Sequence, residues 1–147
     1  MDQIRPVNIF LVEDDPGYAR LVEKSLRRAN ITNNIMLFGN GQEALDFLLD
    51  KSEQTLAMLK EPLLILLDLN MPVTNGYQVL KRLKAEERTK HIPVIILTTT
   101  DDAREIVRCY KLGCNVYVIK PVDYERFSEA MAKLGLFLSI VSVPDGA

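Results

Sequence analysis

One run of five aliphatic residues, 63–67, constrains the fold of this chain more than any other stretch. It leads without a polar break into Asp68, and the turn formers Pro72 and Gly76 follow within a few positions. A continuous apolar run closed by turn formers is typical of a central strand that is covered on both faces. In an open parallel α/β sheet the chemistry lies just beyond the carboxyl ends of the strands. We therefore expect Asp68 to have either a partner or a function at that edge.

Shorter apolar runs and helical patterns alternate along the rest of the chain. Further strands are predicted at 7–12, 34–38, 94–97 and 115–119. Amphipathic spacing predicts five helices. The first begins at Pro16, the next three are centred on 44–49, 77–84 and 106–112, and the last spans about 123–141. This alternation predicts a doubly wound α/β fold, a five-stranded parallel sheet with five helices on its two faces. Residues 50–61 have no clear period, and we interpret them as a helix tail and a surface loop.

Three helix ends carry recognisable signals. Asp15 before Pro16 predicts an N-cap followed by the first helical residue. Thr100 or Asp101 is the expected cap of the helix around 106–112, and Gly113 is its expected stop.

The composition favours one soluble cytoplasmic domain. A length of 147 residues suits a single domain, with a core at about 7–141 and a short tail. Eighteen basic and twenty acidic side chains leave no basic excess for binding nucleic acid. No apolar run is long enough to span a membrane, and no signal-peptide core is present. Cys109 and Cys114, the only cysteines, are expected to be free thiols packed in a reducing compartment.

Reactive side chains stand where the predicted strands end. Glu13 and Asp14 follow the first strand, and Asp68, Thr98 and Lys120 follow the third, fourth and fifth. Because parallel strands align their carboxyl ends, we expect these groups to converge at one edge of the sheet. Three ionised carboxylates there repel one another by roughly 4 kcal/mol per pair at 4 Å.

This repulsion predicts a bound Mg²⁺, which prefers carboxylate and phosphate oxygens. Beside a metal ion, Asp68 could act as a nucleophile toward a phosphoryl group. Lys120 would stabilise charge on the phosphoryl oxygens, and the Thr98 hydroxyl would donate a hydrogen bond to one of them.

Taken together, these motifs resemble the receiver domain of two-component response regulators. The matching segments are Val12-Glu13-Asp14, Asp68 with the turn to Gly76, Pro93 to Thr98, and Lys120-Pro121. The resemblance covers residues 7–141 and implies the CheY-like fold, with strand order 2-1-3-4-5.

The resemblance also implies roles for individual residues. Asp68 would accept a phosphoryl group from a phosphohistidine of a sensor histidine kinase. Asp14 would bind Mg²⁺ directly and Glu13 mainly through water, and Asn70 would offer its backbone carbonyl, leaving its side chain free to vary. Thr98 would be the switch hydroxyl, Lys120 the phosphate partner and Tyr117 the switch aromatic. Asn70 and Thr100 would be the two positions that tune autodephosphorylation.

Partners follow from the same resemblance. The chain is similar to the stand-alone regulators paired with cyanobacterial phytochrome kinases, so its output would be a protein contact. The family implies a homodimer through its fourth helix, fifth strand and fifth helix. Surplus apolar residues in the predicted last helix fit such an interface: Ala130, Leu136, Phe137 and Ile140.

Other interpretations remain open from the residues alone. Asp68 could be a turn or capping residue, Lys120 a surface lysine, and Tyr117 a packing residue. A Mg²⁺-dependent phosphatase with an aspartyl-phosphate intermediate needs an acid two positions after the nucleophile, where this chain has Asn70. A receiver-like interaction module without phosphorylation would not need the whole set of site residues.

Overall fold

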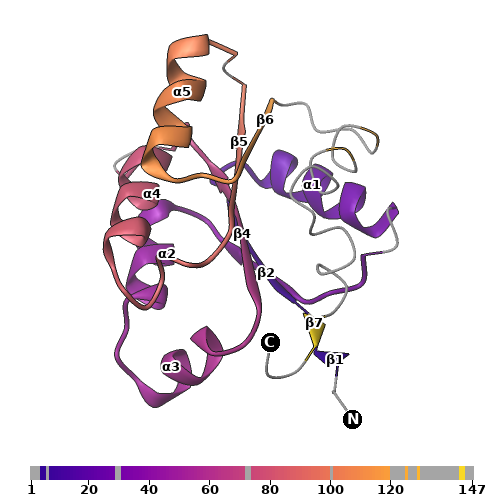
Figure 1. Ribbon diagram of the computed structural model, residues 1–147. Helices are drawn as coiled ribbons and strands as arrows, with labels where there is room; N and C mark the ends of the chain where they lie inside the picture. The colour runs from indigo at the N-terminus through magenta and orange to yellow at the C-terminus, as the bar shows by residue number, and fades with distance from the viewer. Residues whose placement is uncertain are drawn as a thin grey trace.

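The computed structural model has a five-stranded parallel sheet at its centre (Figure 1). It describes residues 4–5, 7–28, 31–71, 74–99, 101–119, 125, 129 and 143–144. The strands lie in the order β3-β2-β4-β5-β6, which is the expected order 2-1-3-4-5 counted within this sheet. Their bounds are Asn8–Val12 (β2), Ile35–Phe38 (β3), Leu63–Asp68 (β4), Val94–Thr98 (β5) and Val116–Ile119 (β6).

Strand β4 is the centre of the core, as its sequence predicts. It pairs in parallel with β2 on one side and with β5 on the other, and all six of its residues are buried. Alternate side chains point to opposite faces of the sheet, so Leu64 and Leu66 pack in one apolar cluster and Ile65 and Leu67 in the other. Burying such a side chain contributes about 1.5–3 kcal/mol. A polar residue inside this strand would therefore be strongly destabilising.

Helices cover both faces of the sheet (Figure 1). One face packs against α1, Pro16–Arg28, through Ala19, Val22 and Leu26. The other face packs against α2, Gly41–Leu48, α4, Gly76–Ala85, and α5, Ala103–Leu112. The predicted last helix, 123–141, lies outside the described residues except for Glu125 and Glu129. None of the described helices is long and apolar enough to cross a membrane.

Two of the three predicted helix ends are confirmed. The Asp15 carboxylate accepts a hydrogen bond of 2.8 Å from the backbone N–H of Gly17. Gly113 ends α5 with a φ of 107°, in the left-handed region that glycine adopts readily. The prediction of Thr100 or Asp101 as the N-cap of α5 is wrong, because the cap is Asp102, which accepts a 2.8 Å hydrogen bond from the N–H of Arg104.

The interpretation of residues 50–61 as a helix tail and loop is also wrong. The segment contains a separate short helix, α3, Glu53–Leu59. Ser52 caps it by accepting a 3.2 Å hydrogen bond from the N–H of Thr55. Only Thr55 and Leu59 of this helix are buried, so too few core positions exist to produce a visible period.

The two ends of the chain pair with each other, which the sequence did not predict. Strand β1, Ile4–Arg5, lies antiparallel to β7, Val143–Pro144, in a second sheet of two strands. Figure 1 shows β1 and β7 side by side below the main sheet. The segment that follows the predicted last helix thus returns to the start of the chain.

Candidate functional site

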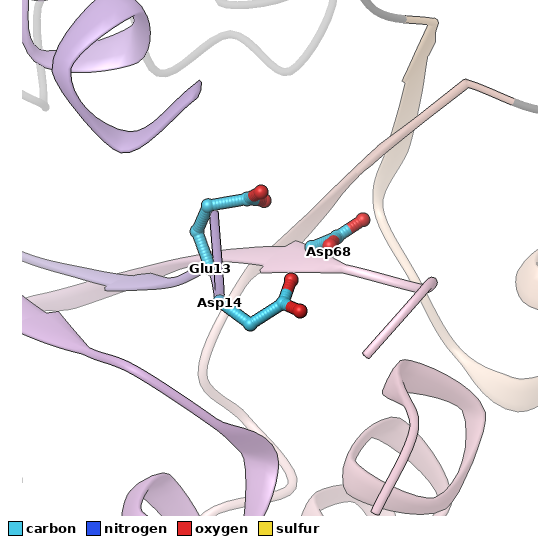
Figure 2. A group of neighbouring side chains, drawn as sticks. All are labelled: Glu13, Asp14 and Asp68. Carbon is cyan, nitrogen blue, oxygen red and sulfur yellow. The ribbon is translucent and has the colours of Figure 1, made fainter. Parts of the chain in front are cut away.

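The three carboxylates singled out in the sequence lie together at the carboxyl ends of β2 and β4. The two strands are parallel neighbours, with Val12 opposite Leu67, so the next residues of each strand meet. One oxygen of each of Glu13, Asp14 and Asp68 lies within 4.8 Å of the others. Figure 2 shows the three side chains converging from two separate strand ends.

These carboxylates differ in their access to solvent. Glu13 and Asp68 are only 3% and 2% exposed, whereas Asp14 is at the surface. At this spacing an ionised pair repels by about 3–4 kcal/mol at an effective dielectric constant near 20. A cluster made only of carboxylate oxygens, with one open side, has the donor chemistry that a hard divalent cation prefers. The residues therefore fit a magnesium or manganese ion.

A glycine lets α4 start directly against the end of β4. A Cβ atom on Gly76 would lie 2.7 Å from the Cα of Leu69 and would collide with the carbonyl oxygen of Asp68. Asn75 caps the helix, since its side chain accepts a 3.1 Å hydrogen bond from the N–H of Gln78. The glycine in the turn after Asp68 is thus required for space beside the carboxylate.

Thr98 is the last residue of β5 and is completely buried. It follows Leu97, which lies opposite Asp68 in the ladder, so its hydroxyl is at the same edge of the sheet. The Asn70 side chain donates a 3.0 Å hydrogen bond from Nδ2 to Thr98 Oγ1. The family resemblance left this side chain free to vary, and the structure instead gives it a specific contact.

Tyr117, on β6, completes a short chain of polar contacts. Its phenol shares a hydrogen bond with the Thr98 hydroxyl. The pKa of Tyr117 is raised to about 12, mainly by burial. The nearby Cys109 and Glu105 also raise this pKa, whereas the hydrogen bond to Thr98 lowers it. The phenol therefore stays neutral at physiological pH.

Two predicted site residues cannot be placed in this geometry. Lys120, with Pro121, and Thr100 lie outside the described residues. Their roles as phosphate partner and as a tuning position remain predictions.

Cys109 and Cys114 are free and buried, as expected of packing residues. The N–H of Cys114 donates to the carbonyl of Cys109 across the turn at Gly113. Burial raises the pKa of Cys109 to about 11 and that of Cys114 to about 12. Both thiols are consequently neutral at physiological pH.

Comparison with known proteins points to one family. Residues 9–132 match the model of the response regulator receiver domain. A receiver domain from Rhodospirillum rubrum is 47% identical, with a TM-score of 0.74 and coverage of 94% of this chain and 97% of that one.

Two further response regulators, Rcp1 and RcpA, are also similar to this chain. Response regulator Rcp1 of a Synechocystis species is 36% identical over 115 residues, 78% of this chain and 77% of Rcp1. Its Mn²⁺-bound structure aligns with a TM-score of 0.69 at 32% identity, covering 89% of this chain and 91% of that one. The phosphorylated cyanobacterial phytochrome response regulator RcpA aligns with a TM-score of 0.74 at 31% identity, covering 95% and 98%.

Proposed function

We propose a specific phosphorylation chemistry for this chain, which belongs to the response regulator receiver family. In this proposal Asp68 accepts a phosphoryl group from the phosphohistidine of a sensor histidine kinase. The observation that carries it is the convergence of Glu13, Asp14 and Asp68 within 4.8 Å at the end of the central strand. A structural role alone would not require three carboxylates at such a cost in repulsion.

Glu13, Asp14, Asp68 and the backbone carbonyl of Asn70 would hold a magnesium ion. When bound, the ion neutralises the carboxylates and the charge on the phosphoryl oxygens. Support comes from the all-oxygen donor set and from the Mn²⁺-bound form described for the relative Rcp1. Glu13 and Asp68 are buried, which limits the contact of two of the three acids with bulk solvent.

The transfer itself uses groups of this chain and of the kinase. An oxygen of Asp68 forms the new bond to phosphorus while the phosphorus–nitrogen bond of the phosphohistidine breaks, and the imidazole leaves with that electron pair. Thr98 then donates a hydrogen bond to a phosphoryl oxygen, and Lys120 pairs with the added negative charge. The chain would catalyse only its own phosphorylation and dephosphorylation, and Asn70 and Thr100 would set the rate of the second step.

The signal leaves the site as a change in protein contacts. Movement of Thr98 toward the phosphoryl group would change its hydrogen bond with Tyr117, and the surface around α5 and β6 would change with it. Val107 and Tyr110 on α5 are 51% and 39% exposed, which supports this surface as the homodimer contact, together with the predicted last helix. The similarity to RcpA, which is a phytochrome response regulator, supports a phytochrome as the kinase. Two buried free thiols suit a cytoplasmic location.

Phosphorylation by a small donor tests the proposed acceptor. The purified protein is incubated with acetyl phosphate and Mg²⁺, and its intact mass is measured. We expect the wild type to gain one phosphoryl group and Asp68→Asn to gain none. Asp46→Asn is the matched control, because Asp46 is an exposed carboxylate on α2 that accepts a hydrogen bond from Gln42. Labelling of Asp68→Asn at the wild-type level would place the acceptor elsewhere.

A further inference from the structure

Asn70 contacts both the proposed acceptor and the proposed switch residue. Its backbone N–H donates a 3.2 Å hydrogen bond to Asp68 Oδ1. Its side-chain Nδ2 donates a hydrogen bond of 3.0 Å to Thr98 Oγ1 and a longer one of 3.4 Å to Thr99 Oγ1. One residue thus ties the carboxylate at the end of β4 to the hydroxyl at the end of β5.

The Thr98 hydroxyl has a limited number of hydrogen bonds to share. A hydroxyl has one proton and two acceptor sites. In this structure Asn70 donates to it, and Tyr117 shares a further hydrogen bond with it. Because Thr98 is completely buried, a contact that it loses is not replaced freely by water. The hydrogen bonds with Asn70 and Tyr117 therefore stabilise the Thr98 hydroxyl in the position that it has in this structure.

We propose that the Asn70 side chain is a latch that holds the Thr98 hydroxyl in the unphosphorylated arrangement and so opposes the switch. The proposal rests on the proposed function, in which phosphorylated Asp68 draws Thr98 toward itself. Asn70 acts here as a positioning residue, through its amide Nδ2 and not through its backbone. It differs from a residue that only controls the access of water to the phosphoryl group, because its effect is already present in the unmodified protein.

The strength of one such hydrogen bond sets the size of the expected effect. A neutral hydrogen bond contributes a net stabilisation that corresponds to about a two- to tenfold change in an equilibrium constant. Removing it by Asn70→Ala should tighten the binding of beryllofluoride with Mg²⁺, a mimic of the phosphoryl group, by about that factor. The backbone N–H to Asp68 and the backbone carbonyl are retained in this variant.

A double-mutant cycle separates the latch from any general effect of Asn70 on the acidic cluster. Beryllofluoride affinity is measured by titration calorimetry for the wild type, Asn70→Ala, Thr98→Ala and the double variant. The latch predicts a gain from Asn70→Ala that disappears in the Thr98→Ala background. An unchanged or weaker affinity of Asn70→Ala, or an equal gain in both backgrounds, overturns it. Thr99→Ala is the matched control, because it removes only the longer contact of the amide.

A second readout needs no phosphoryl mimic. In the unmodified protein with labelled threonine methyl groups, Asn70→Ala should increase exchange at the Thr98 methyl in relaxation-dispersion NMR, whereas Thr99→Ala should not. An unchanged Thr98 signal overturns the latch. If the wild type fails to bind beryllofluoride, the proposed function fails, and the NMR signal still decides the latch. If the wild type binds it normally but the variants do not differ, only the latch fails.

Discussion

Strands β4 and β6 lie in the same sheet, but they hold their functional residues in different ways. Strand β4 is central, it pairs on both sides, and all six of its residues are buried. Strand β6 lies at the edge of the described sheet, with Val116 and Val118 buried and Tyr117 and Ile119 only half-buried. The proposed acceptor is therefore fixed by a strand that cannot shift without disrupting the core. The proposed switch aromatic stands on a strand with one open edge, where a side chain can change position at low cost.

Truncation of one core residue in β4 and one in β6 should give the largest difference in the free energy of unfolding. Leu66→Ala on β4 is expected to lower the free energy of unfolding by about 3–5 kcal/mol, because a large side chain at full burial is removed. Val118→Ala on β6 should cost only about 1–2 kcal/mol, because it removes two methyl groups at a strand with one neighbour. Urea unfolding monitored by circular dichroism measures both. Equal losses would contradict the contrast between the strands.

The turn after β4 should be nearly as sensitive as the strand. Gly76→Ala places a Cβ against the backbone of Asp68 and Leu69, and we expect a loss of about 1–3 kcal/mol in the free energy of unfolding. Gly39→Ala is the control, since its Cβ would meet nothing closer than a Glu43 carboxylate oxygen at 3.8 Å. That variant should unfold at nearly the wild-type urea concentration. A similar loss for both glycines would show that space beside Asp68 is not the reason for Gly76.

A smaller effect is expected on the β6 side at high pH. Tyr117 has a pKa raised from 10.0 to about 12, so the unfolded chain loses the phenolic proton first. Between these values the free energy of unfolding should fall as the pH rises, because the unfolded state binds fewer protons. Cys109 and Cys114, whose pKa values rise from 9.0 to about 11 and about 12, act in the same direction.

Tyr117→Phe separates the phenol from the two thiols. Urea unfolding between pH 10 and 12, the interval between the ordinary and the raised pKa of the phenol, should show a shallower fall for this variant than for the wild type. The two thiols contribute to the fall that remains in this variant. The chain has five tyrosines, so the difference in tyrosinate absorbance between the wild type and this variant gives an independent titration of the Tyr117 phenol. An identical fall in both proteins would mean that the Tyr117 environment does not differ between the folded and unfolded states.

The sheet and its acidic edge were predictable because their signals are local. The apolar run 63–67 specifies a strand buried on both faces, and parallel pairing then aligns the residues that follow each strand. The order of the strands came from the family resemblance, not from the pattern. The proximity of Glu13, Asp14 and Asp68 could therefore be predicted from the amino-acid sequence.

The missed features have weak or non-local signals. Helix α3 has only two buried residues, although Ser52 followed by Glu53 was a usable start signal. For α5, three successive residues could each cap the helix, and only the backbone geometry selects Asp102. The contact between Asn70 and Thr98 joins the turn after β4 to the end of β5, across 28 residues of the chain, so no pattern within one segment reveals it.

In the proposed function, Glu13, Asp14 and Asp68 act as one cation site at the edge of the sheet. Calorimetric titration of the wild type and of Asp14→Asn with Mg²⁺ measures the affinity of this site. We expect one site in the wild type and at least about tenfold weaker binding in the variant, because one of three close oxygen donors loses its charge. Equal affinity for Mg²⁺ in the two proteins would show that these three carboxylates do not form one cation site.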